Sequence, residues 1–328
     1  MTKRLAEVAK KAGVSEATVS RVLNGRNGVS EATRASVLTA LDVLGYERPT
    51  KLRGERGRLV GLVLPELQNP IFPALAEVVT ASLAQRGFTP LLAARTIGGV
   101  PERDYIEMLL DHQVSGVVFA GGSYALADAE HGHYRALTDR RMPVVMVNAG
   151  VSDLGFPHIS TDDAVAVEQA YGHLRSLGHE RVGMVMGPED HVPSRRKLAA
   201  LDGKDYQVER TSFSMESARL AAAKLIERGV TGMICASDVL ALGSIRAARR
   251  LGLDVPGDVS VVGFDDSALM TCTDPPLTTV RQPIEMMGQA AVDLLVNQIE
   301  GSGVEPDELL FEPELVVRGS TGPARKRH

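Results

Sequence analysis

The chain has 328 residues, of which 44% are hydrophobic, so it is long enough to bury cores in two or three domains. The formal net charge of −5 is unevenly distributed: residues 1–58 contain 12 Lys and Arg against 6 Asp and Glu, and the remainder contains 24 against 35. Only the N-terminal segment is therefore suited to bind a polyanion such as a nucleic acid.

The cysteine content and the N-terminus bound the cellular context. Two cysteines, Cys235 and Cys272, are too few for a disulfide framework or a Cys-based metal site, and both lie in apolar or strand-like stretches that predict buried thiols. Residues 1–11 are charged and amphipathic, which is not typical of a signal peptide, and no apolar run is long enough to span a membrane. We therefore expect a cytoplasmic protein with no membrane partner.

Two short helices are predicted at the N-terminus. The apolar residues of the first recur at the i, i+3, i+4, i+7 spacing of one helical face: Leu5, Val8, Ala9 and Ala12. Gly13 ends this helix, and Ser15 is a good N-cap for the next. The inner face of the second helix is predicted to consist of Ala17, Val19, Val22 and Leu23. Two helices joined by such a turn form a helix-turn-helix, whose second helix can enter the major groove of DNA.

A third helix and a basic linker follow. Ser30 is predicted to cap the helix, and Gly45 ends it after an apolar stripe formed by Val37, Ala40, Leu41 and Leu44. Between Tyr46 and Arg58 the chain is basic and contains Pro and Gly, which is typical of a linker.

From Leu59 onward the pattern alternates between strand and helix. The first series has predicted strands at 59–65, 88–94, 115–122 and 143–148, with helices at 72–87 and 102–110. The second series begins near Ile159 with a helix capped by Asp162, and it has strands at 181–186, 205–210, 231–236 and 259–264, with helices near Arg195 and at 215–228 and 239–251. Repeated β-α units build parallel sheets covered by helices, so we predict two α/β lobes with a ligand cleft at the carboxyl ends of the strands.

Four stretches resemble a known family. LAEVAKKAGVSEATVSRVLNG (5–25) and VSEATRASVLTALDVLGY (29–46) are similar to the DNA-binding domain of the lactose-repressor (LacI/GalR) family of bacterial transcription regulators. ASDVLALGSIRAARRLGLDVPGDVSVVGFDDS (236–267) and PPLTTVRQPIEMMGQAAVDLL (275–295) are similar to its effector-binding body, which is related to periplasmic sugar-binding proteins. The resemblance covers nearly the whole chain.

This resemblance implies a fold class and a domain organisation. It implies a three-helix helix-turn-helix domain over residues 1–45, a hinge over 46–58, and a two-lobed α/β effector domain of the type I periplasmic-binding-protein-like class over 59–328. In that fold the last helix and strands cross back between lobes. Lobe 1 is therefore expected to contain about 59–157 and 284–312, and lobe 2 about 158–280 and 313–320.

The hinge departs from the family pattern. Relatives have a helix here that folds on operator DNA and inserts a leucine into the minor groove. In this chain the segment is shorter, and Leu52 follows Pro49 by only three residues, so Leu52 is either such a wedge or a plain linker residue. Arg48, Lys51 and Arg53 are predicted to contact phosphates.

The exposed positions of the second helix are predicted to read bases. A Glu16 carboxylate can accept from cytosine N4, the Ala17 methyl can contact thymine, and Arg21 can bind guanine in bidentate fashion. Glu16 could equally serve only the helix dipole, whereas Arg21 resembles an arginine at the same motif position in relatives. Phosphate contacts or capping roles are predicted for Ser15, Thr18, Ser20 and Asn24.

Catalytic and cofactor motifs are absent from the sequence, so we predict that the chain is not an enzyme. It has no glycine-rich phosphate loop and no nucleophile elbow. His131 and His133 lie in a polar loop without Cys or an acidic cluster, which predicts solvated side chains rather than metal ligands. We therefore expect no metal and no cofactor.

The resemblance also implies an effector site, residue by residue. Asn69 and Phe72 resemble a first-lobe contact pair, Asn148 ends a strand at the cleft, and Arg195 and Lys197 occupy the place of basic contacts. The family's key arginine aligns with Lys197, which cannot bind in bidentate fashion. The remaining candidates are Phe213, which matches a stacking aromatic, Ser237, which stands where relatives often have Asn, and Asp265, which would accept from ligand hydroxyls.

Each of these residues also has a purely structural interpretation. Ser237 or Asp265 could cap a helix, and Phe72 or Phe213 could belong to the core. In addition, the chain lacks about ten residues of the family pattern between Arg196 and Tyr206, which affects one wall of the expected pocket.

Together these observations predict a homodimeric repressor of transcription that binds a pseudo-palindromic operator. A small polyhydroxylated effector, a sugar or a sugar derivative, would control its affinity for double-stranded DNA, because hydroxyl groups need paired donors and acceptors and sugar faces need a flat apolar surface. Two alternatives stay open: a regulator corepressed by a nucleobase, and a sugar-binding protein or enzyme without DNA function.

Overall fold

The computed structural model describes residues 2–23, 29–44, 46, 58–95 and 99–325. The chain divides into two compact units. The N-terminal unit consists of Met1–Leu59 with Gln113–Ser115, and the body consists of Val60–His112 and Gly116–His328.

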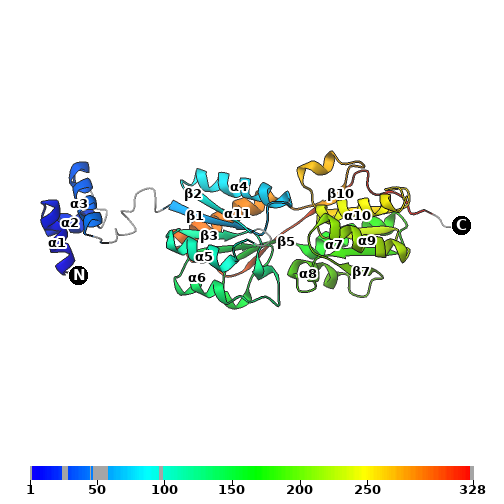
Figure 1. Cartoon of the computed structure of the whole chain (residues 1–328), viewed down its shortest axis with the longest axis horizontal. Coiled ribbons are helices and arrows are strands. Elements are labelled where there is room, and N and C mark those ends of the chain that lie inside the picture. The colour runs from blue at the N-terminus through cyan, green and yellow to red at the C-terminus, as the bar shows by residue number, and fades with distance from the viewer. Residues whose placement is uncertain (1, 24–28, 45, 47–57, 96–98, 326–328) are drawn as a thin grey trace. The chain divides into compact units, whose positions relative to one another are not determined.

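The N-terminal unit contains the three predicted helices, α1 (Thr2–Ala12), α2 (Glu16–Leu23) and α3 (Glu31–Val43) (Figure 1). Both predicted caps are present: the Ser15 Oγ accepts from the Thr18 N–H at 3.1 Å, and the Ser30 Oγ accepts from the Thr33 N–H at 3.2 Å. One small core is formed by Val8, Ala9, Val19, Val22, Val37, Ala40 and Leu41.

The predicted inner face of α2 is wrong at one position. Val19 and Val22 are buried, but Ala17 is exposed. Successive residues of an α-helix are separated by about 100°, so Ala17 lies about 200° from Val19 and faces away from the core. The alanine is thereby available on the outer face of the second helix.

Each lobe of the body is built on a six-stranded sheet (Figure 1). The first sheet has the order β11-β5-β4-β3-β1-β2, and the second has the matching order β12-β10-β9-β8-β6-β7. Strands of the first sheet are β1 (Leu59–Leu64), β2 (Thr89–Ala94), β3 (Gly116–Phe119), β4 (Val144–Val147), β5 (His158–Thr161) and β11 (Glu308–Phe311). Strands of the second are β6 (Val182–Met186), β7 (Gln207–Arg210), β8 (Gly232–Cys235), β9 (Ser260–Asp265), β10 (Thr278–Arg281) and β12 (Glu314–Val316).

The pairing is parallel in the centre of both sheets. Strands β1, β3, β4, β5 and β11 pair in parallel, as do β7, β6, β8, β9 and β10, whereas β12 runs antiparallel to β10. Apolar runs such as the four buried residues of β4 explain this arrangement, because a parallel strand is covered by helices on both faces.

Helices cover the sheets as the alternating pattern predicts. Around the first sheet lie α4 (Ile71–Gln85), α5 (Glu102–Asp111), α6 (Arg135–Asp139) and α11 (Ile284–Ile299). Around the second lie α7 (Asp163–Ser176), α8 (Val192–Ala200), α9 (Met215–Glu227) and α10 (Asp238–Arg250). Short 3₁₀ helices are η3 (Ser123–Ala125), η4 (Gly132–Tyr134), η5 (Ser152–Leu154) and η6 (Ala268–Thr271).

The chain passes between the lobes three times. It crosses between β5 and α7, between β10 and α11, and between β11 and β12. Because β5 pairs with β4 and β11, the first crossing lies at Asp162, a few residues beyond the boundary expected at residue 157. Helix α11 then returns to pack on the first core with α4.

One cysteine expectation is wrong. Cys235 is buried in β8, but Cys272 is exposed. The apolar residues before Cys272 belong to the short helix η6, of which only Met270 is buried. The segment 274–276 that follows is also at the surface. In the described part of the chain, no helix is both long enough and apolar enough to cross a membrane.

The cap of α7 provides a test of the first crossing. The Asp162 carboxylate accepts from the backbone N–H groups of Ala164 and Val165 at 3.0 and 3.1 Å. We expect Asp162→Ala to lower the free energy of unfolding by about 1 kcal/mol, the usual effect of losing an N-cap. Urea denaturation measures this loss, and Glu168→Ala, an exposed position on the same helix, is the matched control. Equal stability of the two variants would contradict the assigned cap.

Candidate functional site

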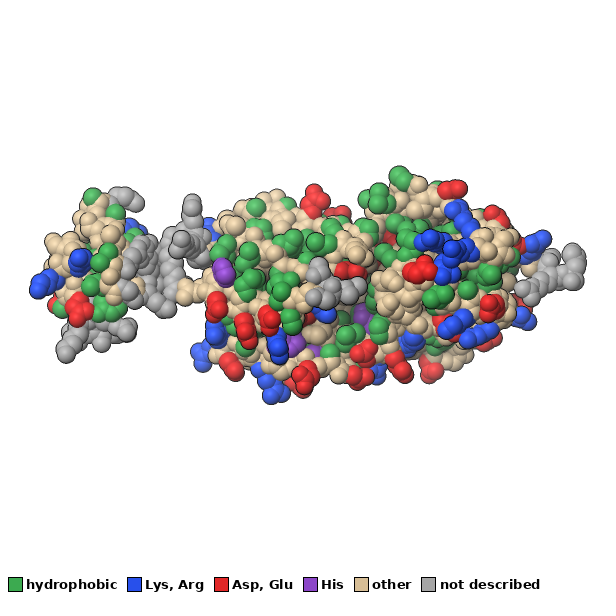
Figure 2. Space-filling model, in the orientation of Figure 1, with side chains coloured by type: hydrophobic (Ala, Val, Ile, Leu, Met, Phe, Trp, Pro, Cys, Tyr) green, Lys and Arg blue, Asp and Glu red, His purple; other side chains and the backbone are tan. Residues whose placement is uncertain are grey.

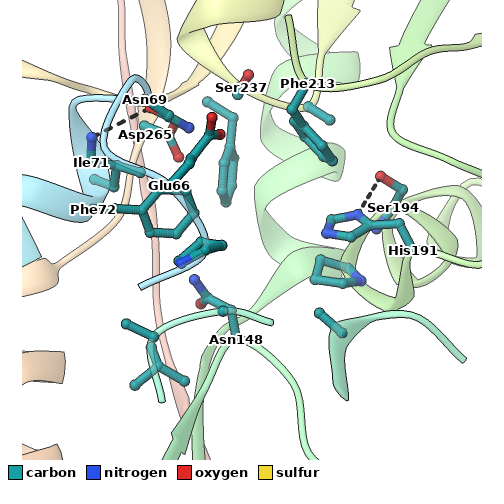
Figure 3. A pocket seen from close by; sticks show the side chains of 18 of the residues that line it. Glu66, Asn69, Ile71, Phe72, Asn148, His191, Ser194, Phe213, Ser237 and Asp265 are labelled. Atoms are coloured by element: carbon teal, nitrogen blue, oxygen red, sulfur yellow. Dashed lines mark hydrogen bonds between the residues drawn. The ribbon is translucent and has the colours of Figure 1, made fainter. Parts of the chain in front are cut away.

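A cavity of about 310 Å³ lies between the two lobes of the body (Figure 3). Residues that follow or end the central strands line it, among them Asn148 after β4 and Asp265 at the end of β9. Its volume is at the lower end of the range of about 300–1,000 Å³ for small-molecule sites. This is the position at the strand carboxyl ends that the alternating sequence pattern predicts.

The residues predicted from the resemblance converge on this cavity, with one exception. The lining includes Asn69, Phe72, Asn148, Lys197, Phe213, Ser237 and Asp265. Arg195 does not line the cavity and is exposed on α8. Residues two positions apart in an α-helix are separated by about 200° around its axis, so Arg195 cannot face the cavity when Lys197 does.

Asp265 is held by donors from two directions. Its carboxylate is buried and accepts from the Gln282 Nε2 at 2.7 Å and from the Asn69 Nδ2 at 3.3 Å. Asn69 belongs to the first lobe, so this hydrogen bond joins the lobes across the cavity. Burial, reinforced by the nearby Asp238 carboxylate, raises the pKa of Asp265 well above its ordinary value.

Two cavity residues are among the five described non-glycine residues with a positive φ. Asn148 has φ 69° and Asp265 has φ 123°, in the region that side-chain-bearing residues rarely adopt. Such conformations cost on the order of 1–3 kcal/mol each, and they cluster at binding sites. Asn148 was predicted as an effector contact from its place at a strand end, and Asp265 was predicted from the family resemblance.

Gln282 connects the cavity to the crossings between the lobes. Its Oε1 accepts from the Thr161 hydroxyl at 2.8 Å, and its Nε2 donates to Asp265. Thr161 ends β5 at the first crossing, and Gln282 lies on the second. The sequence analysis missed Gln282, although its place in a Gln-Pro pair immediately after a strand was an available signal.

Lys197 is engaged with its own lobe. Its ammonium pairs with the Asp163 carboxylate and lies 3.9 Å from the centroid of the Phe264 ring. Both side chains of the pair are buried. Burial raises the pKa of Asp163, against the opposing effect of the Lys197 charge.

His191 caps α8 and faces the cavity. Its Nδ1 accepts from the Ser194 N–H at 3.3 Å and lies 2.9 Å from the Ser194 Oγ. Burial, together with the charges of Lys197 and Arg210, lowers the pKa of His191 to about 3. The imidazole is therefore neutral near pH 7, and because Nδ1 is an acceptor, the proton is assigned to Nε2.

Phe213 packs edge-on against His191, with 4.8 Å between the ring centroids. The ring approaches the backbone closely at Gly187, where an added Cβ would lie 2.6 Å from a ring carbon. A glycine after β6 is thus required for the ring to occupy the cavity wall. His191 and Ser194 were missed because the cap of a short helix has no distinctive signal of ligand binding.

Figure 3 shows how the cavity side chains divide between the walls. Glu66, Asn69 and Phe72 lie on one side, and His191, Ser194 and Phe213 lie on the other. Burial raises the pKa of Glu66.

Ser237 caps α10 by accepting from the Leu240 N–H at 3.2 Å, so its capping interpretation is confirmed. The same residue also lines the cavity.

Further contacts join the lobes at the rim. The Ala127 N–H donates to the Asp190 carbonyl at 2.8 Å, next to a bridge between Leu126 and His191. Arg196 of α8 binds Glu308 of β11 in bidentate fashion at 2.6 and 3.2 Å. Burial alone would raise the pKa of Glu308, but His158 and Arg196 outweigh it and lower that pKa to about 2.

The two histidines predicted to be solvated are partly buried instead. The His131 Nε2 lies 3.0 Å from the Ser123 carbonyl oxygen, and the His133 Nε2 lies 3.2 Å from the Ser123 Oγ and 3.8 Å from the Glu102 carboxylate. The loop folds over the buried Glu102, which the sequence does not reveal. Within the described ranges, no cluster of three or more His, Cys, Asp or Glu is arranged to hold a metal ion.

The outer face of α2 presents the predicted base-reading side chains. Glu16, Ala17 and Arg21 are exposed, and Thr18 and Ser20 are partly exposed. Five predicted DNA contacts lie outside the described residues: Asn24, Arg48, Lys51, Leu52 and Arg53. Figure 2 shows Lys and Arg interspersed with Asp and Glu over the visible face of the body. The net negative charge of this part follows from its sequence, which contains 24 Lys and Arg against 35 Asp and Glu from residue 59 onward.

Comparison with known proteins identifies both parts of the chain. Residues 4–49 match the model of bacterial regulatory proteins of the lacI family, and residues 171–321 match a periplasmic binding protein-like domain. The HTH-type transcriptional regulator MalR of Streptomyces coelicolor is 51% identical over 337 residues, covering 99% of this chain and 98% of that protein. The chain belongs to the lacI family.

Solved structures of lacI-family proteins support the same architecture. The transcriptional regulator CelR in complex with cellobiose is 32% identical, with a TM-score of 0.72, and the match covers 96% of this chain and 99% of that one. The lac repressor dimer bound to operator and the anti-inducer ONPF is 27% identical, with a TM-score of 0.71, and covers 96% and 98%. The predicted fold class is confirmed, and this lacI-family member is a DNA-binding transcriptional regulator rather than an enzyme.

The depressed pKa of His191 predicts a pH dependence of stability. Below about pH 6.5 the unfolded chain binds a proton on this residue while the folded chain does not, so stability is lost as the pH falls from 6.5 toward 3. Relative to His191→Asn, which keeps an acceptor for the Ser194 N–H, the wild type should lose roughly 1–2 kcal/mol more between pH 7 and 5. Denaturant titrations at each pH measure this difference, and parallel pH profiles of the two proteins would contradict it.

Proposed function

We propose that this lacI-family regulator is a homodimeric repressor whose affinity for its operator is controlled by a sugar or sugar derivative bound between the lobes. The carrying observation is the cavity, in which Asn148, Ser237 and Asp265 lie beside Phe72 and Phe213. Amide, hydroxyl and carboxylate groups can pair with ligand hydroxyls, and the two rings offer apolar faces to a sugar ring. The cellobiose complex of CelR supports this ligand class.

The DNA-binding proposal places α2 in the major groove. Arg21 would bind guanine, with Glu16 and Ala17 contacting neighbouring bases, and the capping residue Ser15 with Thr18 and Ser20 would contact phosphates. Asn24, Arg48, Lys51 and Arg53 would add phosphate contacts, and Leu52 is the candidate minor-groove wedge. One helix-turn-helix reads one half-site, so two-fold pairing of the chain would double the footprint on a pseudo-palindromic operator in the cytoplasm.

Coupling between the two sites follows from the contacts that join the lobes. The Asn69–Asp265, Ala127–Asp190 and Arg196–Glu308 interactions exist only when the lobes lie close together. An effector that contacts both walls of the cavity favours this arrangement by its differential affinity. Such coupling is typically worth about 1–3 kcal/mol, enough to change operator affinity 5- to 150-fold.

Selection of bound sequences from a random duplex pool tests the whole proposal. The full chain is used with and without a panel of sugars, and nucleobases are included as the competing effector class. Recovery of a two-fold symmetric site that one sugar depletes from the bound fraction is the expected result. Depletion by a nucleobase instead would favour a different effector class, and failure of the folded protein to enrich any site would contradict operator binding.

Arg21 is expected to contribute base specificity. Arg21→Ala should weaken binding to the selected site by about 1–3 kcal/mol and relax base preference at one position, because a bidentate guanine contact is lost. Lys51→Ala is the comparison: it should weaken all sequences alike and reduce the salt dependence of binding. Titrations of specific and random duplexes at several salt concentrations separate the two, and equal losses on both duplexes for Arg21→Ala would assign it to phosphate.

Asp265 is expected to act on the response and not on DNA binding. Asp265→Ala should abolish release of the operator by the effector found in the selection, while the operator is still bound without effector, because the predicted DNA contacts lie outside the body. Asp139→Ala, an exposed acid on α6, is the control. A retained effector response in Asp265→Ala would remove the residue from the site.

A further inference from the structure

The charges around the cavity bear on the chemical form of its ligand. Resting on the sugar-effector proposal, we infer that the effector is an uncharged sugar and that the site rejects phosphorylated and carboxylated forms. The inference stands on three features of the lining: a cation paired with an acid, acids without a cationic partner among the described residues, and helix N-termini at which side chains already accept from backbone N–H groups.

The cavity offers no free cation to an anionic ligand. Among the described residues, Lys197 is the only Lys or Arg in the lining, and its charge is matched by Asp163. Its side chain is buried, and its ammonium also lies against the Phe264 ring. A phosphate could reach this charge only by displacing a buried carboxylate.

Arg210 lies near the cavity without lining it and donates to the carbonyl oxygens of Gly187 and Pro188, and four other arginines near the cavity are in ion pairs. The pairs are Arg95 with Glu102, Arg196 with Glu308, and both Arg281 and Arg318 with Asp266. His191, which does line the cavity, is neutral and can offer a single N–H donor. A neutral donor of this kind suits a hydroxyl oxygen better than a charged group.

Two acids of the lining have no cationic partner within ion-pair distance among the residues that the structure describes. Glu66 forms no ion pair with any of these residues, and the Asp265 carboxylate is held by the neutral side-chain amides of Gln282 and Asn69. A carboxylate accepts well from sugar hydroxyls, which donate without adding charge. An anion placed beside these acids in their ionised form would instead be repelled, and the largely apolar lining would solvate its charge poorly.

At each helix N-terminus beside the cavity, at least one backbone N–H group already has a side-chain acceptor. Helices α4, α7, α8 and α10 begin there, and a helix N-terminus is a common phosphate site because its N–H groups lack partners. Here side chains accept from those groups: Asn69 from Ile71, Asp162 from Ala164 and Val165, His191 from Ser194, and Ser237 from Leu240. Helices α7 and α10 also carry an acid in their first turn, Asp163 and Asp238.

The test compares each neutral sugar with its own phosphate. Calorimetric titrations of the full chain use maltose, cellobiose and glucose, their 6-phosphates (6′ for the disaccharides), and the corresponding 6-O-methyl ethers as neutral controls for added bulk. For every sugar that binds, we expect the phosphate to bind at least roughly 100-fold more weakly than the methyl ether, because only the phosphate adds charge near the acids. A phosphate that binds as tightly as the ether would overturn the inference.

A charge variant separates repulsion from shape. Glu66→Gln removes one acid and keeps the size of the side chain. It should reduce the ratio of the dissociation constant of the phosphate to that of the ether about tenfold, whereas Glu227→Gln, at an exposed position at the end of α9, should leave this ratio unchanged. The same ratio in the wild type and both variants would show that shape, not charge, excludes the phosphate, and would contradict the inference. Failure of every sugar, neutral or charged, to bind the folded protein would contradict the sugar proposal itself.

Discussion

Most features of the cavity derive from one constraint: the helices that follow parallel strands begin where the strands end, and their first N–H groups need acceptors. In this protein both sheets direct those ends toward the same space. The acceptors are supplied by side chains of the cavity wall, such as Asn69, His191 and Ser237. The same residues therefore cap helices and line the cavity. For Ser237, the structural interpretation as a cap and a place in the cavity lining do not exclude each other.

The same constraint links the cavity to the connection between the lobes. Asp265 receives hydrogen bonds from Asn69 in the first lobe and from Gln282 on a crossing, and Gln282 also binds Thr161 at the end of β5. A ligand that competes for the Asp265 carboxylate thus acts on a group that is already hydrogen-bonded to the first lobe and to a crossing segment. The proposed response can therefore proceed through these hydrogen bonds between the lobes, without repacking of either hydrophobic core.

The sequence was most informative where a pattern repeats or a polar residue interrupts it. Buried runs such as PVVMVN predicted strands, and the polar residue Asn148 at the end of this run predicted a cavity contact, whereas Asp265 was predicted from the family resemblance. Helical rotation explains why Ala17, which was predicted both for the inner face of its helix and as an exposed base contact, lies on the outer face. It also explains why Arg195 does not line the cavity when Lys197 does.

Contacts between distant segments could not be predicted in this way. Glu66 and His191 lie on opposite walls of the cavity but are separated by more than a hundred residues, and no local pattern relates them. The half-buried setting of His131 and His133 depends on Glu102, which belongs to a preceding helix. Gln282 has a polar partner, Thr161, whose position is set by the crossings between lobes.

The return of α11 and β11 to the first sheet has a consequence for biosynthesis. The first core contains Met287, Val292 and Leu295, and β5 needs β11 as its outer neighbour. A ribosome has therefore made the whole of the second lobe's central sheet before the first lobe can complete its own. The nascent chain carries unsatisfied apolar surface through most of its translation, while the N-terminal helices have their small core early. Loss of the last forty residues would consequently damage the lobe made first.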